Sequence, residues 1–314
     1  MYCMIQQQLE PQFIDLDGLP LAVTVTVAIN FYASAAFQES SGDLSGISQS
    51  AAHSSIKAVT NSLLPHVADY INFPIDLTSH LQKATAFSQL AGFPQVLGVT
   101  DYTNVPIQHA DTFFNQRSFH SINLQVVCGH KKISLQVCAK FLAAAFVLRS
   151  SQLPQLFQPP KLIHGLILGD KGCPVRTWIF IPFKSSEMEA QSNYNSSYII
   201  TRSTIIEQAT GFRRICFKCF YCSRGSLQYT TASVSRIVVV CCMLYNFVQW
   251  RGLQIDDDDT MGRAPPSEEE DYEEDDDDKE AAVHLKVSKM VEGEEATNGR
   301  ASGRHDHVTR VEAV

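Results

Sequence analysis

The chain lacks several features that mark specialised classes of protein. Its nine cysteines are odd in number and unevenly spaced, which argues against a disulfide framework and favours reduced thiols in the cytosol or nucleus. The first residues contain no basic stretch leading into an apolar core, so no secretory signal is expected. No internal repeat is visible, and no run of lysine and arginine forms a nuclear-localisation cluster.

Long uninterrupted apolar runs are also missing. Leu19–Phe37 is broken by threonine, serine and asparagine, and Ile237–Trp250 is too short to span a bilayer. We therefore expect no membrane association. With 314 residues, 45% of them hydrophobic, the chain is long enough to bury a real core in one large domain or two small ones.

The charge of the chain is unevenly distributed. Residues 256–280 contain fifteen acidic and two basic residues and so carry −13, whereas the whole chain carries −8, which leaves +5 on the remainder. A mildly basic body with an acidic tail is compatible with a nucleic-acid-binding protein, although ordinary variation in charge explains it equally well. Residues 254–314 have the composition of a disordered, highly charged tail.

The N-terminal part of the chain predicts helices. Residues 1–20 show no regular pattern, and Leu21–Phe37 is ambiguous, because its valines alternate as in a strand while other apolar residues recur at helical spacing. Ser48 is a candidate N-cap for a helix that follows a glycine-containing break. With a third helix over Ser79–Ala91, residues 21–92 predict a helix-turn-helix-like region, and plain helix packing is the alternative.

Residues 93–253 predict an α/β domain. Val96–Val99 is an apolar strand that ends at Thr100-Asp101, and Leu166–Leu168 is another that ends at Gly169-Asp170. Only three residues separate two alternating segments, which indicates a hairpin. The predicted hairpin strands are His120–Gly129 and Ile133–Cys138, the helices are Phe141–Leu153, Thr201–Phe217 and Ser233–Trp250, and Trp178–Pro182 is a further short element.

Three carboxylates have the right order for metal-dependent chemistry. Asp101 and Asp170 follow strands, and Glu207 lies in a predicted helix. Two carboxylates at neighbouring strand ends and one from a helix can bind a pair of Mg²⁺ or Mn²⁺ ions, which activate a nucleophile and stabilise the leaving oxygen in phosphodiester cleavage. Carboxyl groups more than ~10 Å apart would exclude such a pair, whose ions lie ~4 Å apart. Solvated or capping carboxylates are the alternative.

Several motifs occur in the order found in one known family. They include AGFPQVLGVTD before the first acid, FFNQRSFHSINLQVVC after it, LILGDKGCPVRTWIFIPF around the second, and TRSTIIEQATGFRRICFKCF with VVVCCMLYNF around and after the third. Over residues 20–253 the chain resembles the Harbinger/PIF transposase-derived nucleases of the DDE superfamily. The resemblance implies an RNase H-like catalytic core, a DNA-binding N-terminal region and metal-dependent nuclease activity.

The resemblance also implies roles for individual residues. Asp101, Asp170 and Glu207 would be the catalytic acids and would bind Mg²⁺ or Mn²⁺. Two further residues near the third acid, Asn195 and Arg202, would flank it. His120 and Asn123 on or near the second strand could position DNA phosphate or water, and a satisfied polar sheet edge is the alternative, favoured for the nearby Ser121 and Gln125.

Some positions depart from the family pattern. Asn104 stands where a histidine is usual, and Ala143 and Ala144 stand where a His-Asp pair is usual. The first hypothesis is therefore a metal-dependent DNA nuclease with impaired activity. The second is a catalytically inactive binding protein that acts with a Myb-like DNA-binding partner. The family implies the nucleus, with the cytoplasm as a second compartment.

Overall fold

The computed structural model describes residues 19–34, 46–107, 121–140, 144–158, 163–220 and 229–252. The predicted acidic tail at residues 254–314 lies outside these ranges, as do His120, Ala143 and residues 1–18. The domain boundary predicted between residues 92 and 93 stays a prediction. The buried apolar side chains of residues 25–245 form one cluster, which includes the N-terminal helices and the sheet.

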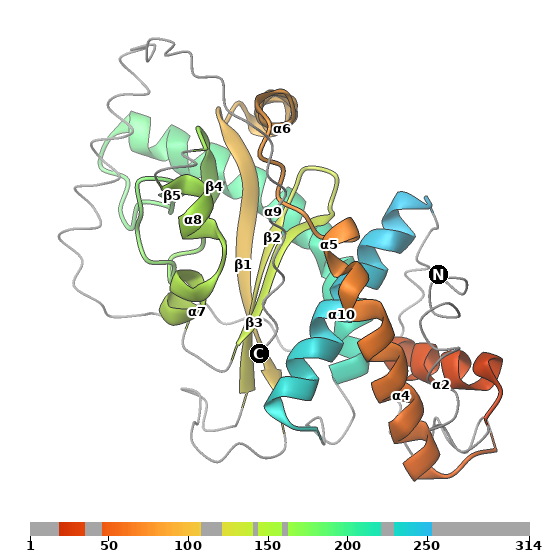
Figure 1. The fold of residues 1–314 in the computed structure, drawn as a ribbon. Coiled ribbons are helices and arrows are strands. Elements are labelled where there is room, and N and C mark those ends of the chain that lie inside the picture. The colour runs from red at the N-terminus through yellow and green to blue at the C-terminus, as the bar shows by residue number, and fades with distance from the viewer. Residues whose placement is uncertain are drawn as a thin grey trace.

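A mixed five-stranded sheet in the order β3-β2-β1-β4-β5 forms the centre of the molecule (Figure 1). Strands β1 (Val96–Pro106), β2 (Ser121–Cys128) and β3 (Ser134–Lys140) are antiparallel neighbours, which confirms the predicted hairpin. Strands β4 (Leu166–Leu168) and β5 (Ile179–Phe180) extend the sheet in parallel with β1. The first and second acidic segments therefore lie on adjacent strands.

Strand β1 is longer than the sequence predicts. It continues through Tyr102, Thr103 and Asn104 to Pro106, so Asp101 lies in the middle of the strand and not at its end. The polar segment is held in the sheet because β2 pairs with it as far as Pro106. The prediction failed because it followed the apolar residues of β1, whereas the backbone pairing of a central strand does not require apolar side chains.

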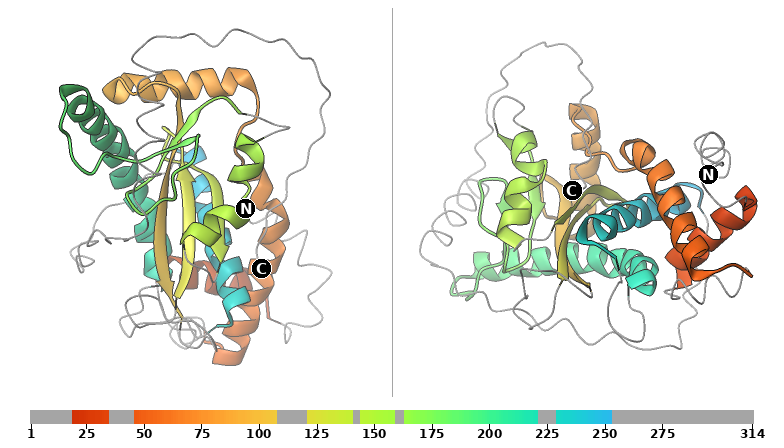
Figure 2. Two further views of the ribbon diagram at one scale, coloured as in Figure 1. Left: turned by 90° about the vertical axis from the view of Figure 1, so that its left-hand side faces the viewer. Right: turned by 60° about the horizontal axis from the view of Figure 1, so that its bottom comes forward.

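Helices cover both faces of the sheet (Figure 2). The 32-residue α9 (Glu189–Phe220) contacts β1 and β2, and α10 (Thr231–Trp250) contacts β3 and β2 from the other side. Helix α9 begins twelve positions before the predicted start at Thr201. The first half of α9 is mostly polar in sequence, which is why the predicted start is too late. Its Tyr194 and Tyr198 side chains are buried and form the apolar face of this half.

The N-terminal helices pack on the end of the molecule formed by α9 and α10. The ambiguous segment is a helix, α2 (Leu21–Ser34), which contacts α4 (Gln49–Leu63) and α9. The Oγ of Ser48 accepts a hydrogen bond from the backbone N–H of Ala51, which confirms the predicted N-cap. Residues 35–45 between α2 and α4 lie outside the described ranges, so the helix-turn-helix stays a prediction. Shorter helical segments follow: η2 (Leu64–His66), α5 (Val67–Tyr70) and α6 (Leu77–Ala91).

Helix α10 is longer than the apolar segment on which the prediction of no membrane association was partly based. Its 20 residues make it long and apolar enough to cross a membrane by length and composition, so the judgement that this segment is too short was wrong. In the structure, 61% of its apolar window is buried, against the sheet, α4 and α5.

The single helix predicted over Phe141–Leu153 is two short ones, α7 (Ala144–Ser150) and α8 (Leu153–Phe157).

Candidate active site at the junction of β1 and β4

The first two predicted acids are neighbours across the parallel pair of strands. Val99 of β1 is in register with Leu168 of β4, and Asp101 and Asp170 each follow their member of this pair by two residues. Because side chains alternate along a strand, a shared step of two residues brings both carboxylates to the same level of the sheet. The predicted convergence of these two acids is therefore observed.

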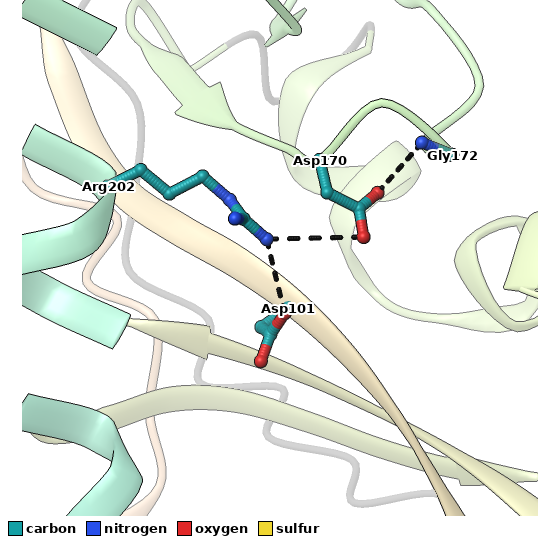
Figure 3. Close-up of polar contacts among 4 residues, drawn as sticks. All are labelled: Asp101, Asp170, Gly172 and Arg202. Atoms are coloured by element: carbon teal, nitrogen blue, oxygen red, sulfur yellow. Dashed lines mark hydrogen bonds and ion pairs between the residues drawn. The ribbon is translucent and has the colours of Figure 1, made fainter. Parts of the chain in front are cut away.

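Arg202 of α9 lies between the two carboxylates (Figure 3). Its Nη2 is 3.2 Å from Oδ1 of Asp101 and 4.0 Å from Oδ2 of Asp170. The two carboxylate oxygens are therefore separated by no more than the sum of these distances, 7.2 Å. This separation is within the limit of ~10 Å that a metal pair requires.

A tight turn fixes the direction of Asp170. Its Oδ1 accepts a hydrogen bond from the backbone N–H of Gly172 at 3.1 Å, and its backbone carbonyl accepts one from Cys173 at 3.1 Å. A Cβ placed on Gly169 would lie 2.7 Å from the sulfur of Cys173, so this position has no room for a side chain. The Gly-Asp-x-Gly-Cys sequence therefore holds the carboxylate at the end of β4 and folds the thiol behind it.

Buried groups behind the carboxylates stay uncharged at neutral pH. Burial is the main cause that raises the pKa of the Cys173 thiol well above its usual value, and the negative charge of Asp170 adds to it. Burial also raises the pKa values of Tyr102 and Tyr198. Two carboxylates and one guanidinium then leave a formal charge of −1 among the three charged residues of Figure 3, a balance that favours a further cation.

The structure does not bring the predicted positioning residue Asn123 to the carboxylates. Asn123 pairs with Asn104, which is three positions after Asp101 on β1. The side chains of Asn123 and Asp101 therefore leave the sheet on opposite faces. On that opposite face Gln125 donates to the hydroxyl of Tyr102 at 2.7 Å, and Ser121 donates to Asn104 at 3.4 Å. Gln125 is fully buried and β2 lies inside the sheet, so these contacts join β1 to β2 and are not those of a sheet edge.

Asn195 is also engaged elsewhere. Its Oδ1 accepts a hydrogen bond from the backbone N–H of Phe183, and its Nδ2 donates to the carbonyl of Phe183 and to the hydroxyl of Ser186. These bonds tie α9 to the segment that follows β5. The structure thus brings together Asp101, Asp170 and Arg202 from the predicted set, and it places Asn195 in a structural contact.

The third predicted acid, Glu207, lies in α9, five residues after Arg202. Five residues turn the helix backbone by about 140° beyond a full turn. The side chain of Glu207 is outside the described part of the structure. Among the side chains that are described, no group of three histidine, cysteine or acidic residues forms a metal site. The role of Glu207 stays a prediction.

The sequence prediction missed the supporting residues of this site. Tyr102 and Cys173 lie near Asp170, and Cys173 contributes to the raised pKa of Tyr102, but neither residue was a candidate. The spacing of Asp170 and Cys173 could have indicated this arrangement, because a turn after a strand can bring a cysteine back against an aspartate three positions earlier. The bridging position of Arg202 had no such signal, since 101 residues separate it from Asp101.

Comparison with known proteins gives consistent matches. Residues 99–246 match the family described as DDE superfamily endonuclease. The chain is 32% identical over 240 residues to the proteins named "Putative nuclease HARBI1" from Bos taurus and Homo sapiens, with 74% of this chain and 68% of each relative covered. The Mus musculus relative of the same name is 30% identical over 238 residues. No solved structure matches.

Proposed function

Because this chain belongs to the Harbinger transposase-derived nucleases of the DDE superfamily, we propose that it is a metal-dependent nuclease that hydrolyses phosphodiester bonds in DNA. The single observation that carries the proposal is the pair of carboxylates, Asp101 and Asp170, held on adjacent strands around one cationic position. The mixed sheet with helices on both faces supports an RNase H-like core for this domain.

The donor atoms fit a hard divalent cation. Mg²⁺ and Mn²⁺ prefer carboxylate oxygen, and a guanidinium already lies within ion-pair distance of both carboxylates. Asp101 and Asp170 would hold the metal, and Glu207 is proposed as the third ligand because its segment matches the family. When bound, the metal would supply a Lewis acid that activates water and stabilises the leaving oxygen.

The residues of the chain itself prepare this position. The turn from Asp170 to Cys173 fixes the direction of one carboxylate, and the strand pairing of β1 fixes the other. Arg202 neutralises part of their mutual repulsion and can donate hydrogen bonds to a phosphate oxygen, for which the planar guanidinium is suited. The neutral thiol and tyrosines behind Asp170 add no charge to the site.

A second candidate function is a catalytically inactive DNA- or protein-binding member of the family, acting with a Myb-like partner. The observation that favours this function is the position of Arg202. Its cationic side chain lies between the two carboxylates and supplies part of the positive charge that a metal would supply. A nuclear location is proposed on the family resemblance alone.

The decisive experiment measures cleavage of duplex DNA by the purified full chain with Mn²⁺ or Mg²⁺. The nuclease proposal expects cleavage that stops with EDTA and in Asp170→Asn. Glu189→Gln is the matched control, because Glu189 is an exposed acid in the first turn of α9. Glu207→Gln tests the third ligand. If the wild-type chain binds DNA but never cuts it with either metal, the inactive function is correct.

A further inference from the structure

A cavity of about 420 Å³ lies away from the carboxylates. It is bounded by the turn between β2 and β3, by α5 and α6, and by the end of α10. The turn follows the pair formed by Cys128 and Val99, whereas Asp101 lies on the other side of that pair. Asp101 is two residues beyond that pair, roughly 7 Å further along β1. The cavity is therefore distinct from the proposed active site.

Two lysines bring positive charge to this cavity from different elements. Lys83 comes from α6 and Lys131 from the turn, and both line the cavity. Neither ammonium has an ion-pair partner among the described residues. Burial lowers the pKa of Lys83, and the charge of Lys131 lowers it further. The two charges thus repel each other across a partly buried space, which favours the binding of an anion.

The acidic residues near the cavity balance this charge only in part. Asp69 lines the cavity, but its side chain is 68% exposed and its Oδ2 is 3.4 Å from Nδ1 of His66. Asp76 raises the pKa of Lys83, but this effect is smaller than those of burial and of Lys131. Its carboxylate caps α6 by accepting a hydrogen bond from the backbone N–H of Ser79. Both carboxylates are therefore engaged with other groups.

His130 adds a polar group to the same wall of the cavity. Its Nδ1 is buried and has no hydrogen-bond partner among the described residues. Burial, followed by the charges of Lys83 and Lys131, lowers the pKa of the imidazole, so the ring is neutral at pH 7. The ring lies edge-on to Phe87 with 6.1 Å between centroids. The neutral ring adds no charge to this wall, so the positive charge at the cavity comes from the two lysines.

Aromatic residues form the remaining wall. Tyr70 and Trp250 line the cavity with their ring centroids 5.3 Å apart, and the Trp250 side chain is 56% exposed. The exposed Trp250 ring beside basic residues suits a nucleotide, whose base can stack on an aromatic ring while its phosphate binds lysine.

From this arrangement we infer that the cavity is a second binding site, for the phosphate group of a nucleotide, in which Lys83 and Lys131 contact the phosphate oxygens. The phosphate comes either from the DNA backbone or from a free phosphate compound. The inference does not depend on cleavage, because none of the residues involved belongs to the carboxylate pair. The site would anchor DNA at a point separate from the reacting bond.

The test uses the full chain and the double variant Lys83→Gln/Lys131→Gln. Lys57→Gln is the matched control, since Lys57 is an exposed lysine of α4 remote from the cavity lining. Calorimetric titration with inorganic pyrophosphate measures the free-phosphate source. Anisotropy of labelled duplex DNA over a salt series measures the backbone source. Lys131→Gln alone changes only an exposed side chain and shows whether misfolding explains the result.

The expected result for a backbone phosphate is a salt slope, the change of log K with log salt, that falls in magnitude by about 1 to 2 in the double variant. The expected result for a free phosphate is pyrophosphate binding by the wild type that the double variant loses. The double variant should produce the same loss when it is made in an Asp170→Asn background, which separates this site from the proposed nuclease function. If both measurements are the same in the double variant and in Lys57→Gln, the inference is wrong.

Discussion

The two faces of β1 use polar residues in opposite ways. On one face Asp101 contacts Arg202, and both side chains remain partly exposed, at 19% and 24%. On the other face Tyr102 hydrogen-bonds Gln125, whose side chain is fully buried. Asp101 and Tyr102 are adjacent in sequence, yet one presents charge and the other holds strands together. The face of the sheet on which a polar side chain lies decides its role, and the identity of the adjacent residues in the sequence does not.

The largest expected effect is on DNA cleavage, which substitutions on the two faces of β1 should change to different extents. Asp101→Asn should reduce DNA cleavage by at least about 100-fold, because it removes one of the two carboxylates proposed to hold the metal. Asn104→Ser changes a polar residue on the other face of the same strand and should leave cleavage within a few-fold. Gel-based cleavage rates with Mn²⁺ measure both variants. Equal losses in the two variants would remove the distinction between the faces.

The next effect separates the faces by stability. Tyr102→Phe removes the hydroxyl that accepts the hydrogen bond of Gln125 and should lower the free energy of unfolding by about 1–3 kcal/mol, because it leaves a buried donor unpaired. Urea denaturation measures this change. Combining Tyr102→Phe with Gln125→Leu should recover part of the loss, since both partners are then apolar. Purely additive losses would show that the bond does not couple the strands.

A smaller effect concerns the cation on the Asp101 face. Arg202→Gln should lower the unfolding free energy of the metal-free protein by roughly 0.5–1 kcal/mol, because partly exposed ion pairs contribute little. It should also increase the thermal stabilisation that Mn²⁺ gives, because the arginine no longer competes for the carboxylates. Differential scanning fluorimetry with and without Mn²⁺ measures both, with Arg202→Lys as the control. A smaller Mn²⁺ effect in Arg202→Gln than in the wild type would contradict this competition.

The smallest effect is alkaline destabilisation through the strand that pairs with β1. Cys128 pairs with Val99, two residues before Asp101, and burial raises its pKa to about 12. Its neutral form is favoured in the folded state, so this contribution to stability is complete below about pH 8.5, the thiol pKa in an unfolded chain, and is lost as the pH rises toward 12. Urea midpoints between pH 8 and 10.5 should therefore fall less steeply in Cys128→Val than in the wild type.

Several local features of the fold were predictable because they depend on short-range chemistry. The Ser48 cap, the β2–β3 hairpin and the presence of strands before Asp101 and Asp170 each follow from residues close together in the sequence. The helix α2 was harder, because its alternating Val-Thr sequence also fits a strand. Packing against α4 and α9 decides between the two, and this packing comes from distant parts of the chain.

The arrangement of the site was predictable only in part. The order of Asp101 and Asp170 allowed their approach to be expected, since both were predicted to follow strands of an α/β domain. The position of Arg202 depends on how α9 crosses the sheet, which no local pattern specifies. The run His130-Lys131-Lys132 was interpreted only as a turn, because its relation to Lys83 and the cavity exists only in the folded chain.

The contact made by Asn246 of α10 has a consequence for the synthesis of the chain. Its side chain accepts a hydrogen bond from the backbone N–H of Ser134 and donates one to the carbonyl of Ser134, as a neighbouring strand would at this edge of the sheet. The two residues are 112 positions apart. At roughly 5–20 residues per second, a ribosome needs about 6 to 22 seconds to reach Asn246 after Ser134. During that interval the start of β3 is an open edge to which a second nascent chain can pair, so slower translation between these residues should increase aggregation.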